Sequence, residues 1–168
     1  MDNAQPSDSM PQENGPHNAP DMPAATDPYY AFGQGVEQFN EGEFYACHDT
    51  IEALWMVADE PDRTFYQGIL QVAVALYHLS NLNWRGAAIL LGEGLKRLNK
   101  YDSQYGGIDV DGLITQVADL LHCLQVAGPE RVEITATQLG LRLGSDHPSL
   151  TGDDCLPIAV LPRIQRLS

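Results

Sequence analysis

The segment from about Thr64 to Ser80 constrains the fold more than any other part of the chain. Drawn as a helix, it has apolar residues on nearly every side, and a helix that is apolar all round is buried all round. We therefore predict a central helix that the others wrap. Its apolar residues are Phe65, Tyr66, Ile69, Leu70, Val72, Ala73, Val74, Ala75, Leu76, Tyr77 and Leu79.

Four amphipathic segments predict the helices around it. Their apolar residues recur at spacings of three and four, which is the helical period. Gly86, Gly92 and Gly94 weaken one of these helices, each by about 1 kcal/mol relative to alanine, and we expect them to permit close helix contact. The fold class is therefore all-α, a five-helix bundle. The four outer helices are predicted from Pro28 to Gly42, about Phe44 to Val57, about Trp84 to Asn99, and Asp109 to Gly128.

The chain divides into three parts by composition. Residues 1–27 are acidic, rich in Pro, Asn and Gln, and have little to bury, so we predict a disordered tail. Residues 28–128 form the helical domain. Residues 129–168 combine alternating apolar residues with two prolines near the end, and we predict an extended or partly ordered C-terminal arm. This arm either lies on the helical body or binds a partner.

The charge of the chain excludes several classes of function. Nine Lys and Arg stand against 23 Asp and Glu, for a net charge of −14. Nucleic-acid binding and anionic membranes both require basic clusters, so neither is expected. No apolar run approaches the roughly 20 residues of a membrane span. Cys47, Cys123 and Cys155 form no CxxC pair, which is typical of reduced thiols in a cytoplasmic protein.

Polar residues interrupt the second and third predicted helices at helical spacing. His48 and Glu52 are four residues apart and share a face. Gln67, Gln71 and His78 fall within about 40° of one another at 100° per residue. In an antiparallel hairpin of these helices, Glu52 lies level with a position between Gln67 and Gln71. His48 lies just above Gln71, so we predict one polar network with His78 at its margin.

Three interpretations of this network remain open. It is a structural set of buried hydrogen bonds that fixes the register of two helices; or His48 is a general base that Glu52 orients; or His48, Glu52 and His78 bind a metal. The metal interpretation lacks a third and fourth well-placed ligand. We predict no cofactor, since the chain has no phosphate-binding loop or complete catalytic motif.

Three blocks of sequence resemble a known family. They are residues 39–55, residues 65–78, and Asn83 with Gly86-Ala87. In this order they resemble the uncharacterised family called domain of unknown function 309, over about residues 30 to 125. The family usually has a His-Glu pair where this chain has His48-Asp49. The resemblance implies an all-α fold with one surrounded helix, and no activity. It marks as family signature positions His48, Glu52, Trp55, Gln67, Gly68, Gln71 and His78.

Two classes of function follow. The first is a non-enzymatic protein-interaction or scaffolding domain, with a protein partner or a second copy in a homodimer. The alternative is a hydrolase-like enzyme, or a metal or small-ligand binder, that uses the polar residues of the second and third helices. A small-ligand pocket would be lined by Trp55, Tyr66, Tyr77 and the glutamines.

Overall fold

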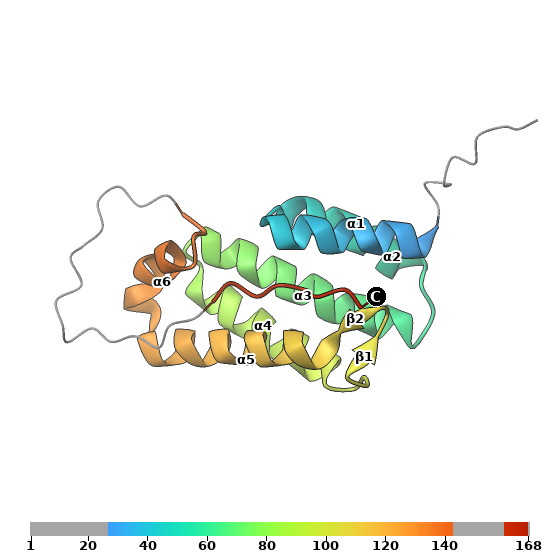
Figure 1. Cartoon of the computed structure of the whole chain (residues 1–168). Helices are drawn as coiled ribbons and strands as arrows, with labels where there is room; N and C mark the ends of the chain where they lie inside the picture. Colours follow the sequence, from blue (N-terminus) through green and yellow to red (C-terminus); the bar gives the residue numbers. More distant parts are fainter. Residues whose placement is uncertain (1–26, 143–159, 168) are drawn as a thin grey trace, which may run out of the picture.

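The computed structural model describes residues 27–142 and 160–167, and this part of the chain is mainly helical (Figure 1). The all-α class is therefore confirmed. The predicted tail over 1–26, and the part of the arm over 143–159, lie outside the described residues. The helices are α1 Pro28–Glu41, α2 Phe44–Val57, α3 Asp62–Ser80, α4 Trp84–Leu98, α5 Val110–Ala127 and α6 Val132–Gln138, with a 3-10 turn at Pro129–Arg131 and a small hairpin of β1 Gln104–Tyr105 and β2 Ile108–Asp109.

Side-chain caps begin three of these helices. The Asp27 carboxylate accepts a hydrogen bond from the Tyr29 amide at 2.9 Å, and Pro28 occupies the first turn. Asn83 and Asp109 cap α4 and α5 in the same way. Such caps satisfy amides that have no partner within the helix, so the predicted helix starts at Pro28 and Asp109 are confirmed.

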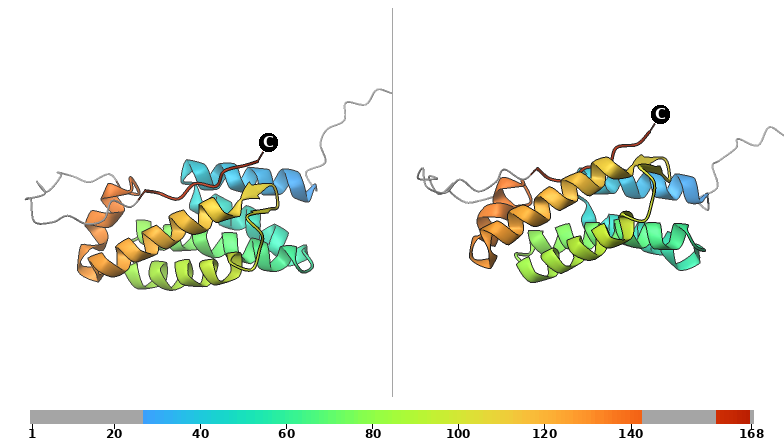
Figure 2. Two further views of the ribbon diagram at one scale, coloured as in Figure 1. Left: turned by 60° about the horizontal axis from the view of Figure 1, so that its bottom comes forward. Right: turned by 90° about the horizontal axis from the view of Figure 1, so that it is seen from below.

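The helices form two layers, which are seen from different sides in Figures 1 and 2. One layer contains α2, α3 and α4, with α3 in the middle. The other contains α1, the extended residues 160–167 and α5, side by side, and it covers the inner face of α3. The hydrophobic core lies between the layers and includes Ile69, Leu76, Leu120 and Ile164.

The predicted central helix is α3, but one stripe of it reaches the surface. Tyr77 is 42% exposed, and Gln67, Gln71, Val74 and His78 are half-buried. The expectation that this helix is buried on every side is therefore wrong. The reason is that the second layer covers only the inner face of α3, while the outer face has α2 and α4 at its sides and, within the described residues, no further helix over it (Figure 2).

Two glycines allow α3 and α4 to approach closely. A Cβ atom on Gly94 would lie 2.8 Å from Cγ2 of Val72 and 3.2 Å from the carbonyl oxygen of Gly68. A Cβ atom on Gly68 would lie 3.0 Å from the Leu98 side chain. Gly68, one of the family signature positions, is thus a packing residue of this interface.

The arm predicted for residues 129–168 contains a short helix, α6, so the bundle has six described helices rather than five. The alternating apolar residues Val132 and Ile134 lie on it. Residues 160–167 are extended and lie on the helical body, with Ile164 only 2% exposed. None of the described helices combines the length and the apolar character needed to cross a bilayer.

Candidate functional site

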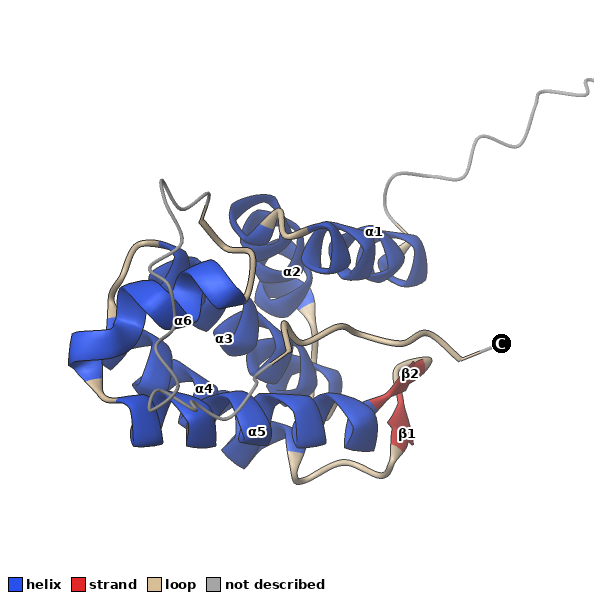
Figure 3. Ribbon diagram, turned by 60° about the vertical axis from the view of Figure 1, so that its left-hand side comes forward, coloured by secondary structure: helices blue, strands red, loops and turns tan. Residues whose placement is uncertain are grey.

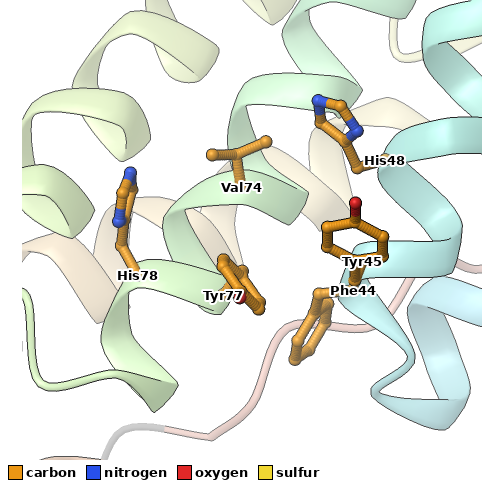
Figure 4. Close-up of a pocket in the computed structure, with 6 residues that line it drawn as sticks. All are labelled: Phe44, Tyr45, His48, Val74, Tyr77 and His78. Carbon is orange, nitrogen blue, oxygen red and sulfur yellow. The ribbon is translucent and has the colours of Figure 1, made fainter.

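The candidate site is a pocket between α2 and α3 on the outer face of the three-helix layer. Its volume is about 190 Å³. Figure 4 shows that one wall comes from α2 and the other from α3, with His48 and His78 on opposite sides of Val74. Two of the signature residues, His48 and His78, therefore reach one surface pocket. The lining residues are Phe44, Tyr45, His48, Val74, Tyr77 and His78.

Two tyrosines form the exposed rim of this pocket. Tyr45 is 65% exposed, and its ring centroid lies 6.0 Å from that of Tyr77 on the neighbouring helix. The Tyr45 ring also stacks on His48 at 6.3 Å, with 26° between the ring planes. The apolar bodies of these rings face one another across two helices, which gives the pocket an aromatic entrance.

His48 is oriented by a carboxylate, but not by the one that was predicted. Its Nδ1 atom lies 3.1 Å from Oδ1 of Asp49, the next residue in the chain. Side-chain exposures of 32% for His48 and 59% for Asp49 place the pair at the surface. The signal that was missed is the His-Asp dipeptide itself, at the position where the resembling family usually has His-Glu.

His78 is held from the opposite direction by a helix cap. The Oδ1 atom of Asn83 accepts from the Gly86 amide at 2.9 Å, so its Nδ2 atom is the one that faces Nδ1 of His78 at 3.1 Å. Because Nδ2 is a donor, Nδ1 of His78 must accept, and the ring proton is on Nε2. The cap of α4 thereby fixes the tautomer of a pocket residue.

The predicted network of His48, Glu52, Gln67 and Gln71 does not form. Among the described residues, no hydrogen bond joins the side chains of Glu52, Gln67 or Gln71 to another residue. Gln67 instead lines a second surface hollow on the α4 side of α3, together with Thr64, Glu93, Lys96, Arg97 and Lys100. The helices pair as expected, but the rotation of α3 points Gln67 toward α4 rather than α2.

The residues of the predicted metal site and of the predicted small-ligand pocket also lie apart from one another. No three His, Cys, Asp or Glu side chains come together as a metal-ligand group in the described part of the chain, so His48, Glu52 and His78 are not assembled into one. The predicted ligand pocket is not formed either. Tyr66 packs on Phe32 in the core, whereas Trp55 stacks under Arg63 at 5.2 Å.

Gln71 has a buried acceptor without a partner, and this leads to a stability prediction. Its Oε1 atom is buried and makes no hydrogen bond, and an unsatisfied buried acceptor destabilises the folded state. We expect Gln71→Met to raise the free energy of unfolding by about 1 kcal/mol, as measured by urea denaturation. Gln67→Met is the matched control and should change it little. A lower stability for Gln71→Met would contradict the prediction.

Cys47 precedes His48 but does not belong to the site. It is fully buried on the core side of α2, and burial raises the pKa of its thiol to about 12. The thiolate is the reactive form, so we expect alkylation of Cys47 at pH 8 to be slower in the native protein than in urea, on the order of a thousandfold. Mass spectrometry of the Cys47 peptide after iodoacetamide treatment measures this. Equal rates in both conditions would show that the thiol is accessible.

The comparison with known proteins concerns the segment that contains this pocket. Residues 32–90 match the family model named domain of unknown function (DUF309). The resemblance seen in the three sequence blocks is thereby confirmed. The DUF309 segment includes most of α1, all of α2 and α3, and the start of α4, and thus every residue that lines the pocket.

A longer protein shares part of this sequence. The chain is 21% identical over 96 residues to an uncharacterized protein of Aquifex aeolicus. The match covers 56% of this chain and 29% of that relative. The matched region therefore spans less than a third of the relative's length.

Proposed function

We propose that this chain is a non-enzymatic protein-interaction domain that binds its partner through the pocket between α2 and α3. The observation that supports this most directly is the pair of exposed, mutually packed tyrosines, Tyr45 and Tyr77, at the entrance of the pocket. Tyrosine is enriched among the residues that contribute most to protein–protein affinity. An exposed pair in contact across two helices is a preformed feature of this kind.

The size of the pocket favours a protein partner over a metabolite. Small-molecule sites have volumes of roughly 300 to 1,000 Å³, whereas this pocket has about 190 Å³. Such a space suits one side chain inserted from a partner. Protein interfaces are commonly dominated by a few anchors of this type in fitted pockets.

The charges around the pocket indicate which charge the partner should have. No Lys or Arg precedes Arg63 in the sequence, while α2 has Asp49 and Glu52 on its accessible surface. The pocket wall made by α2 is therefore acidic at its edge. We infer a partner that presents an apolar anchor side chain with Lys or Arg beside it, since complementary charge steers association and fixes register.

Site-specific photo-crosslinking tests this proposal. A benzoylphenylalanine in place of Tyr45 should give a discrete adduct with one protein in the native cell, and the same group at exposed Ala118 on α5 should not. With the partner purified, Tyr77→Ala should weaken binding by about 30-fold, which corresponds to the roughly 2 kcal/mol of an interface hot spot. Val126→Ala, an exposed apolar residue on another helix, is the control. Equal affinities for both variants would exclude the pocket as the contact surface.

A hydrolase is the second candidate, and the contact of His48 with Asp49 at 3.1 Å is the observation that favours it. A carboxylate on one imidazole nitrogen orients the other as a general base. Ester hydrolysis by the purified chain, lost in His48→Ala and reduced in Asp49→Asn, would support this function. The same background rate in all three proteins would exclude it.

A further inference from the structure

The extended residues 160–167 lie between α1 and α5 (Figures 1 and 3). The surface that they cover includes Asn40 of α1, Gln116 of α5 and residues 107–109 of the hairpin, and it is called the groove below. Pro162 and Ile164 are buried, while Arg163 and Gln165 are exposed. This alternation is that of a β-strand with one face on a surface. The segment therefore sits in its groove as a bound peptide would.

Two side-chain amides hold the main chain of this segment. Asn40 on α1 donates from Nδ2 to the Ile164 carbonyl and accepts from the Ile164 amide on Oδ1, both at 2.8 Å. Gln116 on α5 makes the same pair of bonds with Arg163, at 3.2 and 3.0 Å. One helix on each side of the groove thus supplies a side-chain amide that bonds both the N–H and the C=O of one residue of the segment.

The edge of the small hairpin makes two further hydrogen bonds with the main chain of the segment. The Asp109 amide donates to the Gln165 carbonyl, and the Leu167 amide donates to the Gly107 carbonyl, both at 2.9 Å. Ile108 and Arg166 form an antiparallel bridge. Addition of an extended segment to a strand edge is a known mode of peptide recognition, in which main-chain bonds provide affinity and alternate side chains provide specificity.

Side chains of the segment also contact the helical body. Ile164 inserts into the hydrophobic core. The Arg166 guanidinium lies 5.7 Å from the centre of the Tyr29 ring, and a Cβ atom on Gly33 would come within 3.1 Å of its Nη1 atom. The buried Pro162 and Ile164 and the ring contact of Arg166 thus follow the pattern Pro-x-Ile-x-Arg in the segment.

We propose that this groove is a peptide receptor, and that the C-terminal segment of a second copy of the chain occupies it in exchange for the chain's own. All six hydrogen bonds described above involve the main chain of the segment. None of them requires the segment to belong to the same molecule as the groove. The sequence that fits the groove is present in every copy. Exchange of an identical element between two copies is a low-cost route to a dimer.

The chain between the helical body and the segment is long enough for the segment to occupy either its own groove or that of a second copy. Residues 143–159 separate the described end of the helical body from the segment, and a chain of that length spans up to roughly 60 Å when extended. A tethered ligand has a millimolar effective concentration. Occupation by the chain's own segment therefore prevails in dilute solution, and exchange requires either high concentration or loss of that segment.

A complementation experiment with full-length chains tests the proposal. Ile164→Glu keeps the groove and removes the segment from it, whereas Asn40→Ala with Gln116→Ala keeps the segment and removes both amide grips. Each variant alone should be monomeric by light scattering, and an equimolar mixture should form a one-to-one dimer. The triple variant combines Ile164→Glu, Asn40→Ala and Gln116→Ala, and mixing it with Ile164→Glu should give no dimer. If Ile164→Glu does not fold by circular dichroism, Arg166→Asp replaces it.

A labelled peptide of residues 160–167 provides the second measurement. By fluorescence anisotropy it should bind Ile164→Glu at least tenfold more tightly than it binds either the wild-type chain or the triple variant. N-methylation of the peptide at its Ile164 nitrogen should abolish binding. No binding to a folded Ile164→Glu chain would overturn the receptor itself. Peptide binding without a dimer in the mixture would overturn the second copy as occupant and indicate a segment of another protein.

Discussion

Phe65→Ala is expected to lower the free energy of unfolding by about 4 kcal/mol, within the range found for buried Phe-to-Ala changes. The Phe65 side chain is buried, and four aromatic rings surround it: Phe32, Tyr66, Tyr101 and Tyr105, with centroids 4.9 to 5.8 Å away. These rings come from α1, from α3 itself, and from the chain between α4 and α5. Its removal therefore leaves a cavity at the junction of three elements that the neighbours cannot fill.

Urea denaturation followed by circular dichroism measures this loss. Tyr30→Ala is a suitable control because Tyr30 lies exposed on α1, and surface changes usually stay within about 0.5 kcal/mol. A loss below about 2 kcal/mol for Phe65→Ala would show that the surrounding rings collapse into the space, which contradicts a rigid aromatic cluster.

Two glycines of one helix should respond in opposite directions to alanine. Both substitutions gain about 1 kcal/mol of helix propensity. Gly92→Ala has only Leu121 within reach of the new methyl, at 4.0 Å, so it should be more stable than the wild type. Gly94→Ala places the methyl 2.8 Å from Val72 and 3.2 Å from the backbone of Gly68. Overpacking of this kind costs about 1 to 3 kcal/mol, and the backbone contact places the cost at the upper end.

The free energy of unfolding is expected to differ by about 3 kcal/mol between the two variants, because helix propensity stabilises Gly92→Ala whereas overpacking outweighs it in Gly94→Ala. Thermal unfolding of both proteins in one buffer measures it, with the wild type between them. If both variants were stabilised, α3 and α4 would have to separate without cost, and the close approach at Gly68 and Gly94 would not be a determinant of stability.

The local sequence pattern predicted most of the fold because the signals that mark a helix lie within short stretches of sequence. Apolar periodicity and capping residues such as Asp27 and Asp109 depend only on neighbours within a few residues, so they can be recognised from the sequence alone. Helix α6 was missed because its seven residues are too few for a helical period to emerge from an alternating pattern. The hairpin at 104–109 was missed because each of its strands has only two residues.

The candidate site was less predictable, and Gln67 shows why. Spacing along a helix places residues on one face, but it does not fix how that face is rotated toward a particular neighbour. His48 and His78, both singled out from the sequence, line one pocket, whereas Gln67 lies on the other side of α3. Asn40 and Gln116 were missed altogether, because the main chain that they hold is 124 and 47 residues away.

The order of synthesis gives the groove between α1 and α5 a further property. Both of its helices are made before the segment that fills it, since α5 ends at Ala127 and Val160 follows 33 residues later. At the usual rate of about 5 to 20 residues per second, the ribosome needs roughly two to seven seconds for that stretch. Asn40 and Gln116 therefore gain their main-chain partners in the segment only after the rest of the described structure has been synthesised.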